Sequence, residues 1–586
     1  MKKACKTALT LALAVLMLLS LSVSAFADTG VALTVDTDKV ITNTANVVLG
    51  NVPEKITAIG ESSETSMTLT TYQVIYASYD SASNAVAYHM TDWAKTALAI
   101  ADEPAEQAYI KAHFAVDADS TTAIATTGTS ASEQDVLVNK LAGTADKTEF
   151  TAEWTLSGQQ AAADLPVGVY LVSGRSTGLS FLNMLVSVDL TAVSTAKDGW
   201  QLNAHGAVLK AEPISLTKTT SGEETKEQTA QVGDILTYDV TVAVPCFPAN
   251  ADYTIFRVTD TPTNLAILNT EANPITVYGV KGETKTDITG QVLDAESASA
   301  ITVTEDGSSM TVDFSDAYFT VFTDRTQTEG EEPVITAYTY DKVLITYSVR
   351  VLDSALTTNK TENDVTLIYN PNPYSDEEDE SHTDKNDVFV YGVELLKADT
   401  KGEKLTNAGF GIYTGSGEDL TALKFIQLTE GSYTVADESS LTGEQTENAL
   451  VTEVLTAGAD GKVTVSGLNR DVTYTMKETT APSGYAIDDT EVTFIIADNS
   501  SADGAAKPDG LIDSVTFDAK QDAAWTMTEV TANSAPTFTL NLTDTKLVQL
   551  PQTGGIGTTV FTIGGVVLML AGLALVIFGG RRKKEK

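Results

Sequence analysis

Apolar and polar residues alternate in several runs of the chain, and this alternation restricts its fold more than any other feature. It runs through 237–242, 343–351 and 491–496, where Thr, Val and Tyr dominate. Successive side chains of a strand point to opposite faces of a sheet, so a period of two indicates half-buried antiparallel strands. Gly, Asn and Asp separate the runs, as turns require. The sequence therefore predicts a mainly β protein built of tandem sandwich domains.

The 586 residues are enough for three or four domains. We place three, called the first, second and third modules, at 28–208, 209–385 and 386–547. The second boundary rests on the acidic run 376–380, which follows two prolines and which we interpret as a solvated linker. Calcium is an alternative occupant of this run, but no Asp-x-Asp-x-Asp-Gly loop accompanies it. Helical patterns are few, and the two best lie in the first module, at 92–115, with a break at Pro104, and at 132–141.

Composition excludes several classes of function. The formal net charge of −42 argues against nucleic acid and anionic lipid as partners, because both are bound through Lys and Arg. Cys246 is the only cysteine outside the N-terminal segment, so no intramolecular disulfide can form after that segment is removed. The four histidines are scattered without metal-ligand spacing. We expect no metal and no cofactor.

Both ends of the chain carry targeting signals. Residues 1–27 combine a basic start, an apolar run and the ending Ala25-Phe26-Ala27, which predicts a secretory signal peptide cleaved after Ala27. Residues 560–578 carry no charge and are long enough to span a hydrocarbon layer, and Arg581 to Lys584 follow as a basic stop.

The pentapeptide Leu550-Pro551-Gln552-Thr553-Gly554 comes just before this span. Pentapeptide, apolar span and basic stop, in this order over 548–586, resemble the cell-wall sorting signal of Gram-positive surface proteins. The resemblance implies that a sortase cleaves between Thr553 and Gly554 and transfers Thr553 to an amine. It places the protein outside the cell, covalently attached to peptidoglycan. A plain one-pass membrane anchor is the alternative.

Three runs in the third module each place one ionisable residue on an otherwise apolar face. Burying three such groups separately would be costly, so we expect them to meet in the core. The three faces are Val393, Leu395 and Lys397; Val472, Tyr474, Met476 and Glu478; and Leu540, Leu542 and Asp544.

The same runs, with the stretch 474–485, resemble a Cna B-type pilin domain, an immunoglobulin-like sandwich with an E-box. The family forms a spontaneous isopeptide bond between a first-strand lysine and a last-strand Asn or Asp, assisted by a glutamate. The resemblance implies Lys397 as nucleophile, Glu478 as proton shuttle and Asp544 as acceptor. Asn541 is the alternative acceptor, but it faces away from Leu540 and Leu542. A buried ion-paired triad without a covalent bond is the other interpretation.

The second module repeats this plan less clearly. Lys218 shares a face with Ile214 and Leu216, and Asp260 shares one with Phe256 and Val258. The stretch 363–373 resembles the strand that ends the middle domain of pilin backbone subunits, although that ending usually reads Tyr-Ser-Asn. We name Asn363 as the acceptor, because it shares the face of Val365, Leu367 and Tyr369. Asn370 and Asn372 are alternatives, and ordinary asparagines without a bond are the other interpretation.

The stretches 71–76 and 165–172 of the first module resemble the N-terminal domain of such subunits. In pilins, a polymerising lysine lies near the end of this domain, after a tryptophan and a valine-containing strand. Lys210, ten residues after Trp200, is similar in position, although the usual Tyr-Pro-Lys ending is missing. The resemblance implies that Lys210 is the amine that receives Thr553 of the next subunit. Lys197 is the alternative.

Over nearly its whole length, the chain resembles the major subunit of a sortase-assembled Gram-positive pilus, a structural protein that supports adhesion and not an enzyme with turnover. The implied partners are a pilin-type sortase, a housekeeping sortase, peptidoglycan, other copies of the chain and minor pilins. Host surface ligands are a further class. The alternatives are a wall-anchored adhesin that does not polymerise, a minor pilin at the tip or base, and a wall hydrolase. The chain lacks any His-Glu-x-x-His motif and has only four histidines, which argues against the hydrolase.

Overall fold

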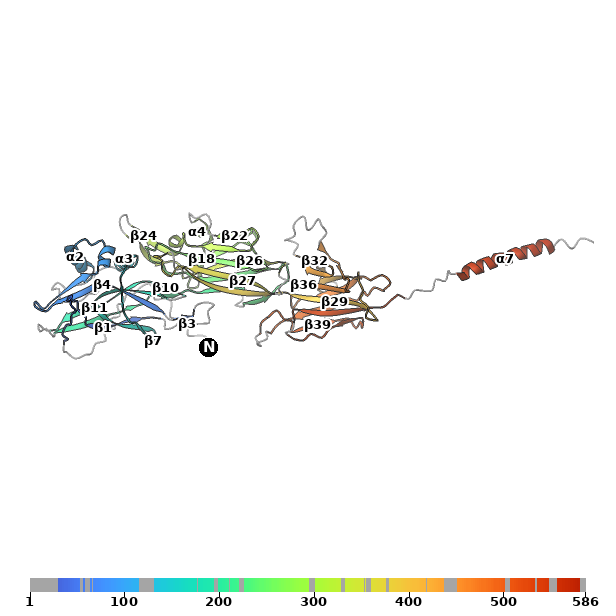
Figure 1. The fold of residues 1–586 in the computed structure, drawn as a ribbon. Helices are drawn as coiled ribbons and strands as arrows, with labels where there is room; N and C mark the ends of the chain where they lie inside the picture. Colours follow the sequence, from blue (N-terminus) through green and yellow to red (C-terminus); the bar gives the residue numbers. More distant parts are fainter. Residues whose placement is uncertain are drawn as a thin grey trace, which may run out of the picture.

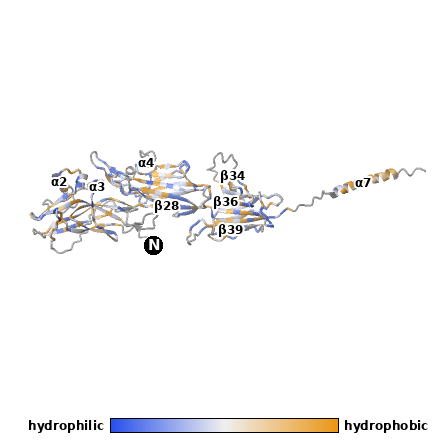
Figure 2. Ribbon diagram, viewed as in Figure 1, coloured by the Kyte–Doolittle hydropathy of each residue, from blue (hydrophilic) through white to orange (hydrophobic). Residues whose placement is uncertain are grey.

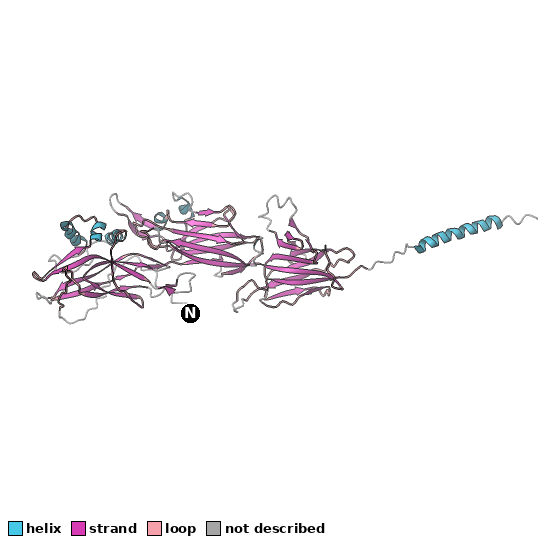
Figure 3. Cartoon of the chain, in the orientation of Figure 1, coloured by secondary structure: helices cyan, strands magenta, loops and turns pink. Residues whose placement is uncertain are grey.

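The computed structural model contains three β modules in a row, followed by one C-terminal helix (Figure 1). Strands make up most of each module (Figure 3), and the mainly β prediction is confirmed. The structure describes residues 30–547 and 556–579, except for 53–55, 58–63, 66, 115–130, 176–177, 194–198, 210, 221–225, 295–300, 328–331, 353, 355–359, 376–378, 418, 437–450, 501–505 and 533–534.

The first module pairs a six-stranded sheet with a four-stranded sheet. The larger sheet has the order β12 (Trp200–His205), β11 (Met184–Ala192), β9 (Gly168–Arg175), β4 (Thr68–Asp80) and β5 (Ala85–Met90), with β6 (Glu149–Phe150) on β4. The smaller has the order β13 (Ala207–Val208), β1 (Thr44–Gly50), β8 (Gln160–Pro166) and β7 (Thr155–Ser157). Two strand pairs complete the module: β2 (Ile56–Thr57) with β3 (Glu64–Thr65), and β10 (Leu179–Phe181) with β14 (Ala211–Pro213).

Helices lie beside the first module, close to where the sequence predicts them. They are α1 (Asp92–Ala97), α2 (Glu103–His113) and α3 (Ala131–Ala142). The predicted break at Pro104 is displaced: the gap precedes α2, and Pro104 occupies its first turn, where a missing N–H costs nothing. The Asp102 side chain accepts a hydrogen bond from the Ala105 amide at 2.9 Å and so caps this helix.

Two six-stranded sheets form the second module. One has the order β15 (Leu216–Thr220), β17 (Ile235–Ala243), β26 (Lys342–Val351), β20 (Thr276–Lys281) and β21 (Thr284–Asp287), with β19 (Leu265–Leu268) on β26. The other has the order β16 (Glu227–Thr229), β28 (Glu380–Phe389), β27 (Lys360–Tyr369), β18 (Phe256–Pro262), β23 (Met310–Asp313) and β22 (Ile301–Val303). The module also contains α4 (Thr289–Asp294), α5 (Tyr318–Phe322), and the pair β24 (Thr323–Thr326) with β25 (Val334–Tyr338).

The acidic run 376–380 does not separate two modules, contrary to the sequence-based interpretation. Its last residue, Glu380, begins β28, which pairs with β27 in antiparallel register from Tyr369↔Glu380 to Lys360↔Phe389. The second module therefore continues past 385 to Phe389. Glu380 Oε2 accepts a hydrogen bond of 2.8 Å from the Tyr369 hydroxyl, so this carboxylate has a structural role.

The third module packs a seven-stranded sheet on a six-stranded one. The first has the order β34 (Val451–Thr452), β32 (Phe425–Thr429), β33 (Ser432–Val435), β36 (Lys462–Leu468), β29 (Tyr391–Asp399), β41 (Thr537–Asp544) and β40 (Trp525–Met527). The second has the order β31 (Thr421–Ala422), β30 (Gly409–Thr414), β37 (Tyr474–Thr480), β38 (Val492–Ala497) and β39 (Ser514–Asp518), with β35 (Leu455–Thr456) on β30.

The second and third modules are closely joined. Only Val390 separates β28 from β29, and one cluster of buried apolar residues extends from Ile214 to Leu542. At the junction, the Tyr391 hydroxyl donates a hydrogen bond of 2.6 Å to the buried Asp498 carboxylate. The first module has a core of its own.

Helix α7 (Ile556–Gly579) extends beyond the third module, and it is hydrophobic along most of its length (Figure 2). Its span Gly557–Phe578 is long and apolar enough to cross a membrane. Its described side chains are mostly exposed, so this helix does not form part of the core of a module.

Candidate functional site

The third module brings together the three ionisable residues that its sequence pattern singles out. Lys397 Nζ lies 2.8 Å from Glu478 Oε1 and forms an ion pair with Asp544 Oδ1. The side chains of all three are at most 1% exposed. Lys397 also lies above the ring of Phe410, with 5.8 Å from Nζ to the ring centre.

Strand register explains why these residues meet. Strand β29 runs parallel to β41, with Lys397 opposite Leu542 and Asp399 opposite Asp544. Asp544 is therefore a diagonal neighbour of Lys397 on the inner face of this sheet. Glu478 lies on β37 in the facing sheet, opposite Phe410 of β30. The cluster thus ties the first strand of the module to its last, with the glutamate contributed from across the core.

Burial changes the acid–base properties of both carboxyl groups. Desolvation raises the pKa of Glu478 and of Asp544 above their ordinary values, against the opposing effect of Lys397. The Asp488 amide donates a hydrogen bond of 2.8 Å to Glu478 Oε2 and fixes its orientation. Asp544 Oδ2 is buried, with no hydrogen-bond partner among the described residues. A carboxyl group with a raised pKa beside an amine is suited to accept and return a proton.

Asn541, the alternative acceptor, lies outside this cluster. Its Nδ2 donates a hydrogen bond of 3.3 Å to the Thr528 hydroxyl at the protein surface. Its neighbours Leu540 and Leu542 point to the opposite, buried face of β41. The structure therefore places Asp544, and not Asn541, beside Lys397.

The second module contains a similar pair, Lys218 on β15 and Asp260 on β18. The two side chains form an ion pair and are fully buried. Desolvation lowers the pKa of Lys218 to about 8, although Asp260 opposes the shift, and burial raises the pKa of Asp260. Lys218 is therefore much closer to a neutral amine at physiological pH than an exposed lysine is.

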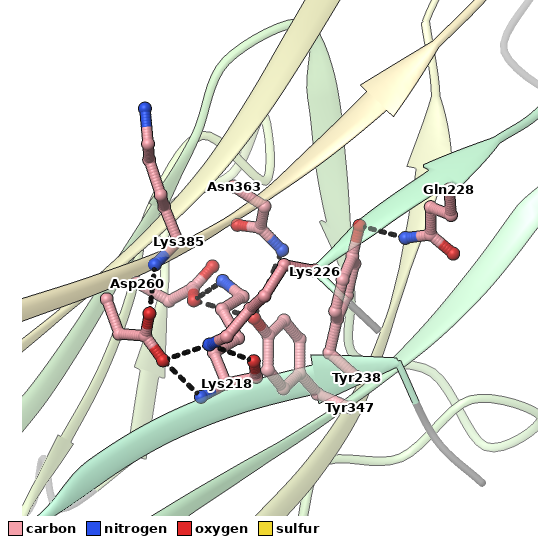
Figure 4. A network of polar contacts seen from close by, with 9 residues as sticks. Lys218, Lys226, Gln228, Tyr238, Asp260, Tyr347, Asn363 and Lys385 are labelled. Atoms are coloured by element: carbon pink, nitrogen blue, oxygen red, sulfur yellow. Dashed lines mark hydrogen bonds and ion pairs between the residues drawn. The ribbon is translucent and has the colours of Figure 1, made fainter. Parts of the chain in front are cut away.

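Asn363, the predicted acceptor, reaches this pair through Tyr347 (Figure 4). The Tyr347 hydroxyl donates a hydrogen bond of 2.6 Å to Asp260 Oδ2 and accepts one of 3.2 Å from Asn363 Nδ2. Asn363 is fully buried, and its Oδ1 has no hydrogen-bond partner within the described part of the chain. Lys218 Nζ lies 5.1 Å and 5.5 Å from the ring centres of Tyr238 and Tyr347. Asn363 thus belongs to the lysine cluster.

The two alternative acceptors lie elsewhere. Asn370 donates to the Ser375 carbonyl and accepts from the Asn372 amide, so both stabilise the turn after β27. At about 3.3 Å per residue, Asn370 is roughly 23 Å from Asn363 along the strand. Asn370 therefore lies too far along the chain from the cluster around Asn363 to meet Lys218.

The structure adds residues that the sequence did not indicate. Asn386 lies directly opposite Asn363 in the β27–β28 pair and is also fully buried. Asp384 accepts hydrogen bonds from the Lys218 amide, at 2.7 Å, and from Lys226. No sequence signal indicates Asn386 or Asp384, because β28 lacks clean alternation. Tyr347 differs, because its hydroxyl interrupts the otherwise apolar face of the run 343–351.

Several predicted residues lie outside the described part of the structure: Lys197, Lys210 and the pentapeptide Leu550, Pro551, Gln552, Thr553 and Gly554. The neighbours of Lys210 are described. The Leu209 amide donates to the Gly50 carbonyl, and Ala211–Pro213 pairs with Leu179–Phe181. Both flanks of Lys210 are therefore held by the first module. Across the described ranges, no group of three or more His, Cys, Asp or Glu is arranged to hold a metal ion.

Comparison with known proteins agrees with this architecture. Residues 392–507 match the prealbumin-like fold domain SpaA, and residues 543–586 match the LPXTG cell wall anchor motif. The third module is thus a prealbumin-like domain, and the chain is a surface protein anchored to the cell wall. No curated protein matches the sequence.

Solved structures extend the likeness to all three modules. The T6 backbone pilin of Streptococcus pyogenes serotype M6, described as a modular three-domain structure, is 15% identical, with a TM-score of 0.52; the match covers 88% of this chain and 100% of that one. The full-length major pilin SpaD of Corynebacterium diphtheriae is 17% identical, with coverage of 88% and 99% and a TM-score of 0.42. The major pilin SpaA of the same species is 13% identical, with coverage of 86% and 100% and a TM-score of 0.42. The chain therefore has the fold of a Gram-positive backbone pilin.

Proposed function

We propose that this protein is the major subunit of a covalent pilus that a sortase assembles on the cell wall. One observation carries the proposal: a chain with the fold of the whole T6 backbone pilin ends in a cell-wall anchor motif. A solitary anchored protein needs the motif but not this three-module fold. The role is structural, with no catalytic turnover.

In the proposed polymer, a pilin-type sortase cleaves after Thr553 and joins its carbonyl to Lys210 of the next subunit. The described neighbours of Lys210 support this role, because Leu209 is hydrogen-bonded to Gly50 and Ala211–Pro213 pairs with Leu179–Phe181 of the first module. A housekeeping sortase would attach the finished polymer to peptidoglycan, and minor pilins would join the same polymer. Host surface ligands are a further class of partner.

The two buried lysine clusters are proposed to form intramolecular isopeptide bonds. In the third module, Lys397 attacks the Asp544 carboxyl while Glu478 takes up and returns protons, and water leaves. In the second module, Lys218 attacks the Asn363 amide with Asp260 as the acid–base group, and ammonia leaves. Full burial, direct ion pairing and the shifted pKa values of the carboxyl groups support both reactions.

The test is a blot of digested cell wall from the native organism under reducing, denaturing conditions. A ladder of high-mass species in the wild type that is absent in Lys210→Ala supports both the polymer and its linking residue. A ladder that persists in Lys210→Ala supports the covalent polymer, rejects Lys210 as its linking residue and favours Lys197 as the linking amine. A single band of monomer size in the wild type identifies a solitary anchored adhesin.

A further inference from the structure

Tyr347 occupies a special position in the lysine cluster of the second module. It lies on β26 and is 1% exposed, and its hydroxyl contacts Asp260 on one side and Asn363 on the other. This hydroxyl joins the acid to the acceptor amide: it is 2.6 Å from Asp260 Oδ2 and 3.2 Å from Asn363 Nδ2 (Figure 4). Asn363 Nδ2 is the atom that must leave when its amide is exchanged.

The chemistry of an asparagine acceptor requires a proton at that atom. An amide nitrogen leaves as ammonia only after it has gained a proton, so an acid must reach Nδ2. In the third module, the lysine contacts both carboxyl groups directly, and the proton needs no intermediary. Among the described residues, no tyrosine hydroxyl hydrogen-bonds to Lys397, Glu478 or Asp544. A tyrosine hydroxyl between the acid and the acceptor is therefore specific to the second module, whose acceptor is an amide.

We propose that Tyr347 is a catalytic residue that relays a proton from Asp260 to the leaving nitrogen of Asn363. The proposal rests on the Lys218–Asn363 bond proposed above and adds a residue and a proton path to it.

The steps balance as follows. Lys218 Nζ gives a proton to Asp260, and the neutral amine attacks Cγ of Asn363, which forms the new C–N bond. In the tetrahedral intermediate, Nδ2 has a lone pair, so both hydrogen bonds of Tyr347 reverse. Asp260 then donates to the hydroxyl oxygen while the hydroxyl proton moves to Nδ2. The C–Nδ2 bond breaks and ammonia leaves. Nζ then gives its second proton to Asp260, which is ionised again after the relay. Of the two protons that Nζ loses, one therefore leaves with ammonia and the other remains on Asp260.

The surroundings fit a relay by a neutral hydroxyl. Burial, and the neighbouring Asp260, hold the pKa of Tyr347 well above its ordinary value, so the phenol accepts and donates at once and does not ionise. Burial also raises the pKa of Asp260, which favours the protonated acid that the relay requires. The hydroxyl of the nearby Tyr238 accepts a hydrogen bond from Gln228 Nε2.

The test compares Tyr347→Phe with Tyr369→Phe in the full chain. Tyr369 is a matched control, because it is also a fully buried tyrosine of the second module whose hydroxyl donates to a carboxylate, Glu380. Tryptic digests are analysed by mass spectrometry for the peptide pair joined through Lys218 and Asn363, lighter by one ammonia. The fraction joined is measured at purification and during incubation. We expect linkage at least about 100-fold slower in Tyr347→Phe, the typical contribution of acid–base catalysis, and unchanged in Tyr369→Phe.

The outcomes separate the relay from the bond itself. A wild-type chain without the joined pair overturns both proposals. A joined pair that forms equally fast in Tyr347→Phe overturns the relay and retains the bond. Circular dichroism and the Lys397–Asp544 link in the same digest report whether the variant folds. For a variant that does not fold, 3-fluorotyrosine at position 347 restores a hydroxyl of nearly the same size. Restored linkage supports the relay, and its absence overturns it.

Discussion

Glu478→Gln offers a direct measure of what the third-module bond contributes. The substitution keeps the size of the side chain and leaves Lys397 beside Asp544, but it removes the group proposed to move protons. We expect that the Lys397–Asp544 bond does not form, so the mass of the chain, once corrected for the replacement of Glu by Gln, is higher than that of the wild type by one water. The two linked residues are 147 positions apart in the chain.

The expected loss of stability follows from the length of the closed loop. A cross-link over about 147 residues lowers the entropy of the unfolded chain by an amount worth about 5 kcal/mol at 25 °C. For a domain of this size, each kcal/mol shifts the melting temperature by about 2–4 °C, so the melting transition of the third module should fall by roughly 10–20 °C. The assay is differential scanning calorimetry of the wild type and variant, with intact mass measured on the same samples.

Glu491→Gln serves as the matched control. Glu491 forms a half-exposed ion pair of 2.9 Å with Lys477 on the neighbouring part of the same sheet, and such pairs contribute at most about 1 kcal/mol. Once its mass is corrected for the replacement itself, it should show the same loss of water as the wild type, and its melting temperature should change by a few degrees at most. Two results would refute the reasoning: loss of one water in Glu478→Gln, or loss of the bond with a transition that shifts no more than in the control.

Three further predictions follow from the same structure. Asp260→Asn should abolish the loss of ammonia in the second module and leave the third-module link intact; peptide mapping that finds both links would exclude Asp260 as the acid–base group. Asn541→Ala should keep the third-module link and Asp544→Ala should lose it, and the reverse pattern by intact mass would identify Asn541 as the acceptor. The first module should lose stability as the pH rises, because a hydrogen bond of 2.6 Å to Asp189 raises the pKa of His205. The stability from this pair is complete below about pH 6.5 and is lost as the pH rises through the raised pKa of the folded state. Thermal melting between pH 6 and 9 should therefore show a slope that His205→Asn flattens, and an unchanged slope in the variant would contradict the assignment.

Much of the third-module site could be predicted from the sequence, because its residues lie in strands with clean alternation. On β29, β37 and β41, a period of two determines which side chains share the buried face. Lys397, Glu478 and Asp544 are ionisable members of those faces, as is Asp399 at the end of β29. The mainly β class follows from the same pattern and is confirmed. The distinction between Asp544 and Asn541 also follows, since adjacent positions on a strand face opposite sides.

Strand pairing between distant segments could not be predicted in this way. The first half of β28 is polar, so neither its pairing with β27 nor the position of Asn386 opposite Asn363 has a periodic signal. For the same reason, the acidic run 376–380 has the sequence of a linker, although its last residue, Glu380, lies in β28 and pairs with β27. The contacts of Tyr347 depend on three strands, β18, β26 and β27, which come from two different sheets. Lys210 as the polymerising amine stays a prediction.

In the proposed polymer, the positions of the two lysine clusters determine how much of each subunit can lengthen under tension. With all proposed bonds closed, tension between Lys210 and Thr553 passes through 210–218, crosses to Asn363, follows the chain through β28 and β29 to Lys397, and crosses to Asp544. This path contains only about 50 residues, with a contour length of at most roughly 180 Å, whereas the unlinked segment of about 340 residues could extend beyond 1,100 Å. The loops between the linked residues, which hold most of both modules, carry no load. Such a filament would lengthen very little under tension, and most of each folded module would lie beside the segments that carry the force.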